Sequence, residues 1–130
     1  MPEDVHLLIW PTTRDYAMSA ILMSIKQSVA RRAVTGVKRQ APAFLPNIKD
    51  AQPNGKRHYR FWQRSGGHDR NIVEPAAAWA QIDYYHANPV RRGLCGRPED
   101  WAWSSAREYV DPGSGPLRID FECLPRTRQG

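Results

Sequence analysis

Residues 74–94 read Glu-Pro-Ala-Ala-Ala-Trp-Ala-Gln-Ile-Asp-Tyr-Tyr-His-Ala-Asn-Pro-Val-Arg-Arg-Gly-Leu, and this stretch predicts a helix with polar chemistry at its C-terminal end. Proline is favoured at the first helical position, and the four alanines that follow Pro75 favour helix. Pro89 restricts the backbone of Asn88, so the helix is expected to end or kink there. Tyr84 and Asn88 are four residues apart and share one helical face.

The end of this helix has the groups needed for phosphoryl chemistry. A phenol can attack a phosphorus atom, and a side-chain oxygen one turn away can hold a metal ion beside it. Arg91 and Arg92 follow at once and suit phosphate binding. Two structural interpretations remain open: Tyr84 as an amphipathic core residue, and Asn88 as a helix C-terminal cap.

A second possible part of the site lies at the start of the chain. Residues 5–10 are an apolar run that predicts a short buried strand. On a strand, Asp4 and His6 project to the same side and can hold one ion between them. Such triplets also occur by chance.

The chain between these two stretches predicts a long helix, a loop and a strand. Residues 16–34 carry a helical apolar stripe, with Asp15 and Gly36 expected at its ends. Residues 37–57 lack a pattern and are expected to form a long irregular loop. Residues 58–63 are aromatic and predict a strand.

Composition and charge narrow the class of protein. At 130 residues the chain is expected to form one domain at residues 1–110 and a loose C-terminal tail at 111–130. Its 19 Lys and Arg against 13 Asp and Glu give a net charge of +6 and suit a polyanionic partner such as nucleic acid, or an unspecialised basic surface. Two cysteines without metal-binding spacing, and no apolar run of about 20 residues, indicate a cytoplasmic protein that does not span a membrane.

Aromatic rings alternate with arginine in residues 60–64, Arg-Phe-Trp-Gln-Arg. This pattern is typical of surfaces where unpaired bases stack on rings and arginines contact phosphates. A core strand with solvated arginines explains the same residues equally well.

Five ordered stretches resemble the signatures of single-tyrosine HUH transposases, and in particular the REP-associated tyrosine transposases. The resemblance covers residue 1 to about residue 109. The stretches are Met1–Leu8, Ser24–Gln27, Arg60–Arg64 with Asp69–Ile72, Tyr84–Leu94, and Pro98–Trp101 with Trp103–Ala106.

This resemblance implies an α+β fold, a ferredoxin-like or RRM-like palm of antiparallel strands backed by helices. It implies cleavage and rejoining of single-stranded or hairpin DNA during transposition of a mobile element. Tyr84 would be the nucleophile of a 5′-phosphotyrosine intermediate, and His6, Asn88 and Asp4 would hold Mg²⁺ or Mn²⁺. The implied DNA-binding residues are Lys26, Arg60, Trp62, Arg64, Arg70, Arg91 and Arg92.

Two departures from the family pattern leave the activity of this chain open. Position 4 is Asp where the family has His; aspartate is a hard oxygen ligand that suits magnesium, or the change has cost the site its geometry. The family also has elements before the HUH strand, so we expect an N-terminally truncated palm.

Three hypotheses follow for the chain as a whole. It is an active transposase-like nuclease, a catalytically inactive DNA-binding remnant of one, or an unrelated structural protein. Whether it is a monomer or a homodimer stays open.

Overall fold

The computed structural model describes residues 4–51, 55, 57–63 and 67–126, and the chain divides into two compact units. Unit 1 comprises Met1–Trp10 and Asp69–Gly130, and unit 2 comprises Pro11–His68. Helices and strands both occur, so the predicted α+β class is confirmed. Within the described parts of the chain, no helix combines the length and apolar character needed to cross a bilayer.

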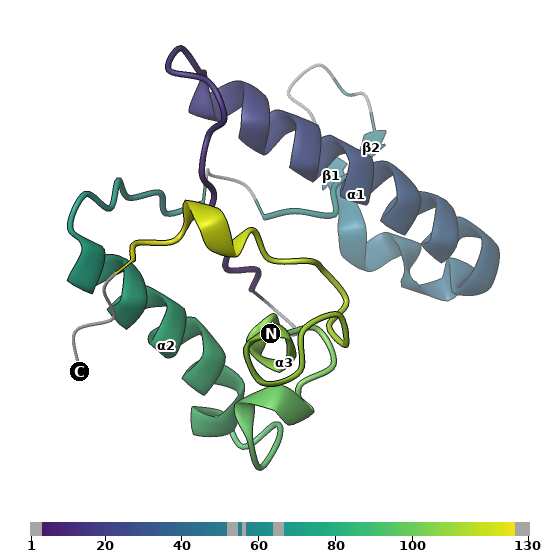
Figure 1. Ribbon diagram of the computed structural model, residues 1–130. Coiled ribbons are helices and arrows are strands. Elements are labelled where there is room, and N and C mark those ends of the chain that lie inside the picture. The colour runs from purple at the N-terminus through teal and green to yellow at the C-terminus, as the bar shows by residue number, and fades with distance from the viewer. Residues whose placement is uncertain (1–3, 52–54, 56, 64–66, 127–130) are drawn as a thin grey trace. The chain divides into compact units, whose positions relative to one another are not determined.

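Unit 2 contains one long helix, a 3-10 helix and a two-stranded antiparallel sheet (Figure 1). In the sheet, Lys49 pairs with Tyr59 and Asp50 with His58. The elements are α1 (Met18–Gln40), η1 (Pro42–Ile48), β1 (Lys49–Ala51) and β2 (Arg57–Tyr59).

Helix α1 was predicted in the right place but with the wrong ends. It starts at Met18, where Ala17 is the N-cap and no side chain caps it, so Asp15 does not act as a cap. It continues through Gly36 to Gln40. Glycine costs a helix about 1 kcal/mol relative to alanine, and the apolar stripe extends past it with the partly buried Val37.

The long irregular loop predicted for residues 37–57 is wrong. Its first residues extend α1, and η1 and β1 occupy much of the remainder. The predicted strand at 58–63 is shorter and shifted, since β2 ends at Tyr59. Proline at the first turn of η1 suits a helical start because no backbone donor is needed there.

Two polar contacts hold unit 2 together after β2. The Arg60 guanidinium forms an ion pair with the buried Asp50, with Nη2 2.6 Å from Oδ2. The indole Nε1 of Trp62 donates to the backbone carbonyl of Lys26 at 2.8 Å, which ties the chain after β2 to α1.

Unit 1 is built around α2 (Pro75–Arg91), and the prediction of a helix that begins with Pro75 at its first position is confirmed (Figure 1). Pro89 lies inside the helix and does not end it. Proline removes the backbone N–H that would donate to the carbonyl four residues earlier, yet the helix continues for two residues beyond it. Gly93 then adopts a positive φ of 68° and ends the helical chain path.

The short elements of unit 1 pack beside α2. They are η2 (Pro98–Asp100), α3 (Ala106–Val110) and η3 (Phe121–Cys123). The small core contains the buried Ala78, Ile82 and Ala106. Tyr109 of α3 makes edge contacts with Trp79 and Phe121.

Residues 113–126 pack against the rest of unit 1, whereas the sequence predicted a loose tail. Phe121 packs on the Tyr109 ring at a centroid distance of 5.1 Å. The Trp79 indole donates to the Pro125 carbonyl at 3.1 Å. These contacts join residues that are far apart in sequence, so no local sequence pattern predicts them.

The predicted buried strand at residues 5–10 is also wrong. Residues 4–10 form neither helix nor strand, and Val5 and Trp10 are 61% and 68% exposed. Among the described residues the sheet consists of β1 and β2 alone, so it is smaller than the palm that the resemblance implies. A single strand is not stable without a neighbour to pair with, so residues 5–10 do not form one.

Glu108 closes the loop that follows α3. Its carboxylate is buried and accepts hydrogen bonds from the backbone N–H groups of Gly113 at 2.9 Å and Gly115 at 2.7 Å. These two bonds, first that from Gly113, hold the pKa of Glu108 below its ordinary value. A Cβ on Gly115 would lie 2.6 Å from the Glu108 Cγ, so only glycine allows this approach.

Replacing Glu108 by Gln is expected to lower the melting temperature at pH 7 by a few degrees, because the amide offers only one acceptor to two backbone donors. A depressed folded pKa gives stability that is present above the unfolded value of about 4.3 and is lost as pH falls through the folded value. Thermal melts from pH 7 to pH 3 should therefore show the wild-type advantage shrinking toward pH 3. The exposed Glu122→Gln is the control; a Glu108→Gln deficit that stays constant over this range would contradict the charge argument.

Candidate active site on α2

The last turns of α2 place three predicted site residues on one face. Tyr84, Asn88 and Arg91 follow at helical spacings of four and three. Tyr84 is 44% exposed, whereas Asn88 is buried. The Arg91 guanidinium lies over the Tyr84 ring, 5.5 Å from its centroid. A phenol therefore faces solvent with a cation at its ring and an amide one turn away.

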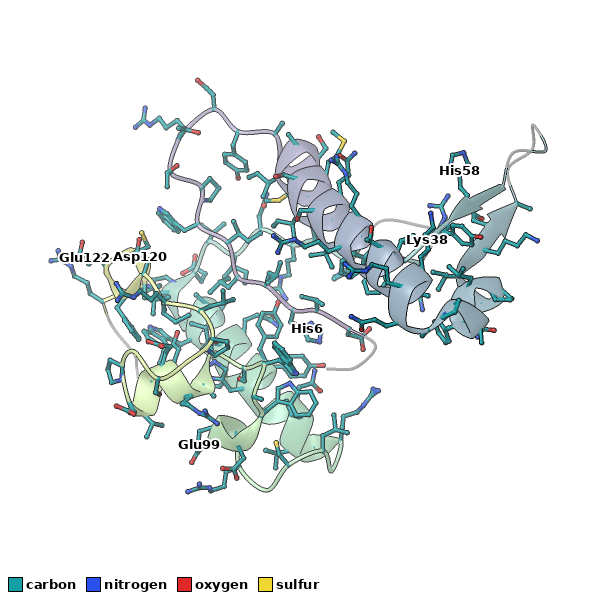
Figure 2. All side chains as sticks on the ribbon, turned by 90° about the vertical axis from the view of Figure 1, so that its right-hand side faces the viewer. His6, Lys38, His58, Glu99, Asp120 and Glu122 are labelled. Atoms are coloured by element: carbon teal, nitrogen blue, oxygen red, sulfur yellow. The ribbon has the colours of Figure 1, made fainter. Side chains whose placement is uncertain are left out.

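His6 joins this face from the N-terminal segment (Figure 2). Its Nε2 lies 3.2 Å from the Asn88 Nδ2, a contact between residues 82 positions apart. The two orientations of an asparagine amide exchange the positions of Oδ1 and Nδ2. Asn88 can thus donate to a neutral imidazole or present an oxygen beside it.

The His6 ring is held by the two tyrosines of α2. Tyr85 stacks on it with centroids 4.8 Å apart and planes at 20°. Tyr84 meets it edge-on at 6.4 Å and 75°. The stacked ring restricts rotation of the imidazole, and the edge contact leaves the exposed phenol beside it.

The His6 and Asn88 side chains fit the donor set of a divalent cation. Two adjacent ligands of an octahedral Mg²⁺ with bonds of about 2.1 Å lie about 3 Å apart. The His6 Nε2 lies 3.2 Å from the Asn88 Nδ2, and Oδ1 takes that position when the amide is turned. Amide oxygen suits Mg²⁺ and Mn²⁺, and imidazole is the commonest metal ligand among side chains. Within the described residues, no group of three His, Cys, Asp or Glu is placed to bind a metal.

Asp4, the third expected ligand, is exposed and lies two residues before His6. Because the segment is not a strand, the argument that alternate residues share one side does not apply to it. Its role as a ligand stays a prediction.

The predicted DNA-binding residues divide between the two units. Arg91, Arg92 and Arg70 belong to unit 1 and are exposed. Lys26, Arg60 and Trp62 belong to unit 2, where all three take part in the contacts around α1 and β2. Arg64 lies outside the described residues.

Sequence reasoning missed Tyr85 as a neighbour of His6. Its position next to Tyr84 gave no signal, because the stacking depends on where residues 4–10 run along α2. His86, on another face of α2, is a packed and hydrogen-bonded histidine. Its Nε2 lies 2.9 Å from the Ser105 Oγ, and its ring contacts Tyr109.

Comparison with known proteins gives one informative match. The chain is 23% identical over 110 residues to a Haemophilus influenzae protein described as "Putative REP-associated tyrosine transposase". The alignment covers 85% of this chain and 57% of that protein, so the chain spans little more than half the length of the relative. No family model matches the chain. No solved structure matches it.

Proposed function

We propose that this chain is a transposase-like protein of the REP-associated tyrosine type, which cleaves and rejoins single-stranded DNA at a hairpin or repeat element. The observation that carries the proposal is the contact between His6 and Asn88 beside the exposed Tyr84. A distant match to a transposase relative, over 85% of this chain, supports the same class of function. The net charge of +6 suits a DNA partner.

In the proposed reaction, the Tyr84 phenolic oxygen attacks the scissile phosphorus and loses its proton to water. The bond from phosphorus to the 3′ oxygen breaks, and that oxygen takes up a proton and leaves as a free 3′-hydroxyl. The product is a 5′-phosphotyrosine link. Attack by another 3′-hydroxyl reverses these steps and rejoins DNA without ATP, because the link conserves the phosphodiester bond energy.

The chain's own residues would orient this reaction. A divalent cation between His6 and Asn88 would supply charge stabilisation at the phosphoryl oxygens. Tyr85 holds the His6 ring in place through stacking. Arg91, whose guanidinium lies next to the Tyr84 ring, would contact the phosphate that the phenol attacks.

The test is an adduct assay on a labelled hairpin oligonucleotide with a single-stranded flank. With Mn²⁺, a 3′-end label is expected to migrate with the protein on a denaturing gel, while a 5′-end label is released on a short fragment. The fully paired duplex of the same sequence is the control and should give no adduct. A 5′ label retained by the protein would contradict the proposed polarity.

Binding of DNA without cleavage is the second candidate function. Aspartate at position 4, where the resembling family has histidine, favours it. Salt-dependent binding of the hairpin without any adduct would support this candidate over the nuclease.

A further inference from the structure

One face of α1 carries cations and neutral polar side chains but no carboxylate. None of the 23 residues of α1 is Asp or Glu. All members of this face are exposed. We call it the basic face of α1, and it consists of Ser24, Gln27, Ser28, Arg31, Arg32, Thr35, Lys38 and Arg39.

The cations of the basic face form two parallel rows. At about 100° per residue, Arg31 and Lys38 fall in one row and Arg32 and Arg39 in the other, with the rows about 100° apart around the axis. Within each row the two residues are seven positions apart, or about 10.5 Å along the helix. The small hydroxyl side chains lie between the rows.

The described residues of unit 2 leave the charge of the basic face without a carboxylate partner. Arg31 donates to the Gln27 amide at 3.1 Å, and the Lys38 ammonium lies 5.2 Å from the centre of the Tyr59 ring (Figure 2 labels Lys38). Both partners are uncharged. Among the described residues, no carboxylate forms an ion pair with any of the four cations, in contrast to Arg60, which pairs with Asp50.

This arrangement matches the backbone of a DNA duplex. The major groove of B-DNA is about 12 Å wide and admits an α-helix. Cations on both flanks of such a helix meet phosphates, while short hydroxyl side chains between them leave room for the groove edges.

We propose that the basic face of α1 binds the sugar-phosphate backbone of double-stranded DNA. This duplex would be the stem of the hairpin that is cut at the Tyr84 site. That identification rests on the proposed function, whereas duplex binding itself does not. Duplex binding by α1 needs no single strand and no chemistry at Tyr84.

The test is the salt dependence of binding to a fluorescent 20-base-pair duplex without single-stranded ends. Arg31, Arg32, Lys38 and Arg39 are replaced together by Gln. Each phosphate contact contributes about 0.9 to the slope of log Kd against log salt concentration, so the slope is expected to fall by about 3 to 4. The Kd at low salt should rise at least about 30-fold.

The control removes the same charge from exposed arginines elsewhere, by Gln at Arg14, Arg107, Arg118 and Arg126. It should change the slope by less than about one. Two double variants, one for each row, cover the case that the fourfold variant misfolds. Each should show about half of the fall in slope expected for the fourfold variant. Wild-type slopes in the row variants, or equal losses in the control, would overturn the proposal, as would binding to anionic lipid vesicles but not to the duplex.

The outcomes separate this proposal from the proposed function. Tyr84→Phe is expected to bind the duplex as the wild type does. The predicted slope change without any adduct on hairpin DNA would contradict the nuclease alone. An adduct without the slope change would contradict the role of α1 alone.

Discussion

The Tyr84→Phe variant is expected to form no covalent adduct with single-stranded hairpin DNA, a loss of at least about 10³-fold against the wild type. Removing the nucleophile of another covalent enzyme costs about 10⁶-fold in turnover. The change deletes one exposed oxygen and keeps the ring that meets His6 edge-on and lies under Arg91. The folded structure and the DNA affinity should therefore stay near wild type.

Tyr85→Phe is the matched control for this variant. The two residues are neighbours on α2, and phenylalanine keeps the ring that stacks on His6. Adduct formation should persist within a few-fold of wild type. Loss of the adduct in Tyr85→Phe with retention in Tyr84→Phe would show that Tyr85, and not Tyr84, is the nucleophile.

The second large effect is expected at His6. His6→Ala removes the nitrogen that lies 3.2 Å from the Asn88 amide. Loss of residues that merely support a ligand commonly costs 10- to 100-fold in metal affinity or activity, so loss of a ligand should cost at least about 100-fold in adduct rate at low Mn²⁺. Asn88→Ala should show a similar loss, and raising the Mn²⁺ concentration should recover part of it.

His58→Ala is the control, because His58 is an exposed histidine on β2 in unit 2. Its adduct rate and Mn²⁺ dependence should match those of the wild type. Asp4→His tests the departure at position 4: a gain in rate would show that aspartate weakens the site. An unchanged Mn²⁺ titration in His6→Ala would show that His6 is not a ligand of the metal ion.

Helix α2 and its chemical face could be predicted from sequence because both depend on local rules. Proline at the first position and a run of alanine specify a helix start, and helical spacing puts Tyr84 and Asn88 on one face. The meeting of His6 with this face followed only from the resemblance, since no local rule joins residues 82 positions apart.

Two of the incorrect predictions share a physical cause. The apolar run at 5–10 has strand composition, but strand formation depends on a neighbour elsewhere in the chain. Residues 113–126 are held by contacts of Phe121 and Pro125 with α3 and α2. Tertiary contacts decided both outcomes.

The most direct test of the central claim is to map the residue that carries the DNA. After nuclease trimming of the adduct, trypsin should release residues 71–91 with a nucleotide attached, since Arg70 precedes this peptide and Arg91 ends it. Fragmentation in the mass spectrometer distinguishes the two adjacent tyrosines. The account predicts the nucleotide on Tyr84; a nucleotide on Tyr85 or on any tyrosine outside this peptide would contradict it.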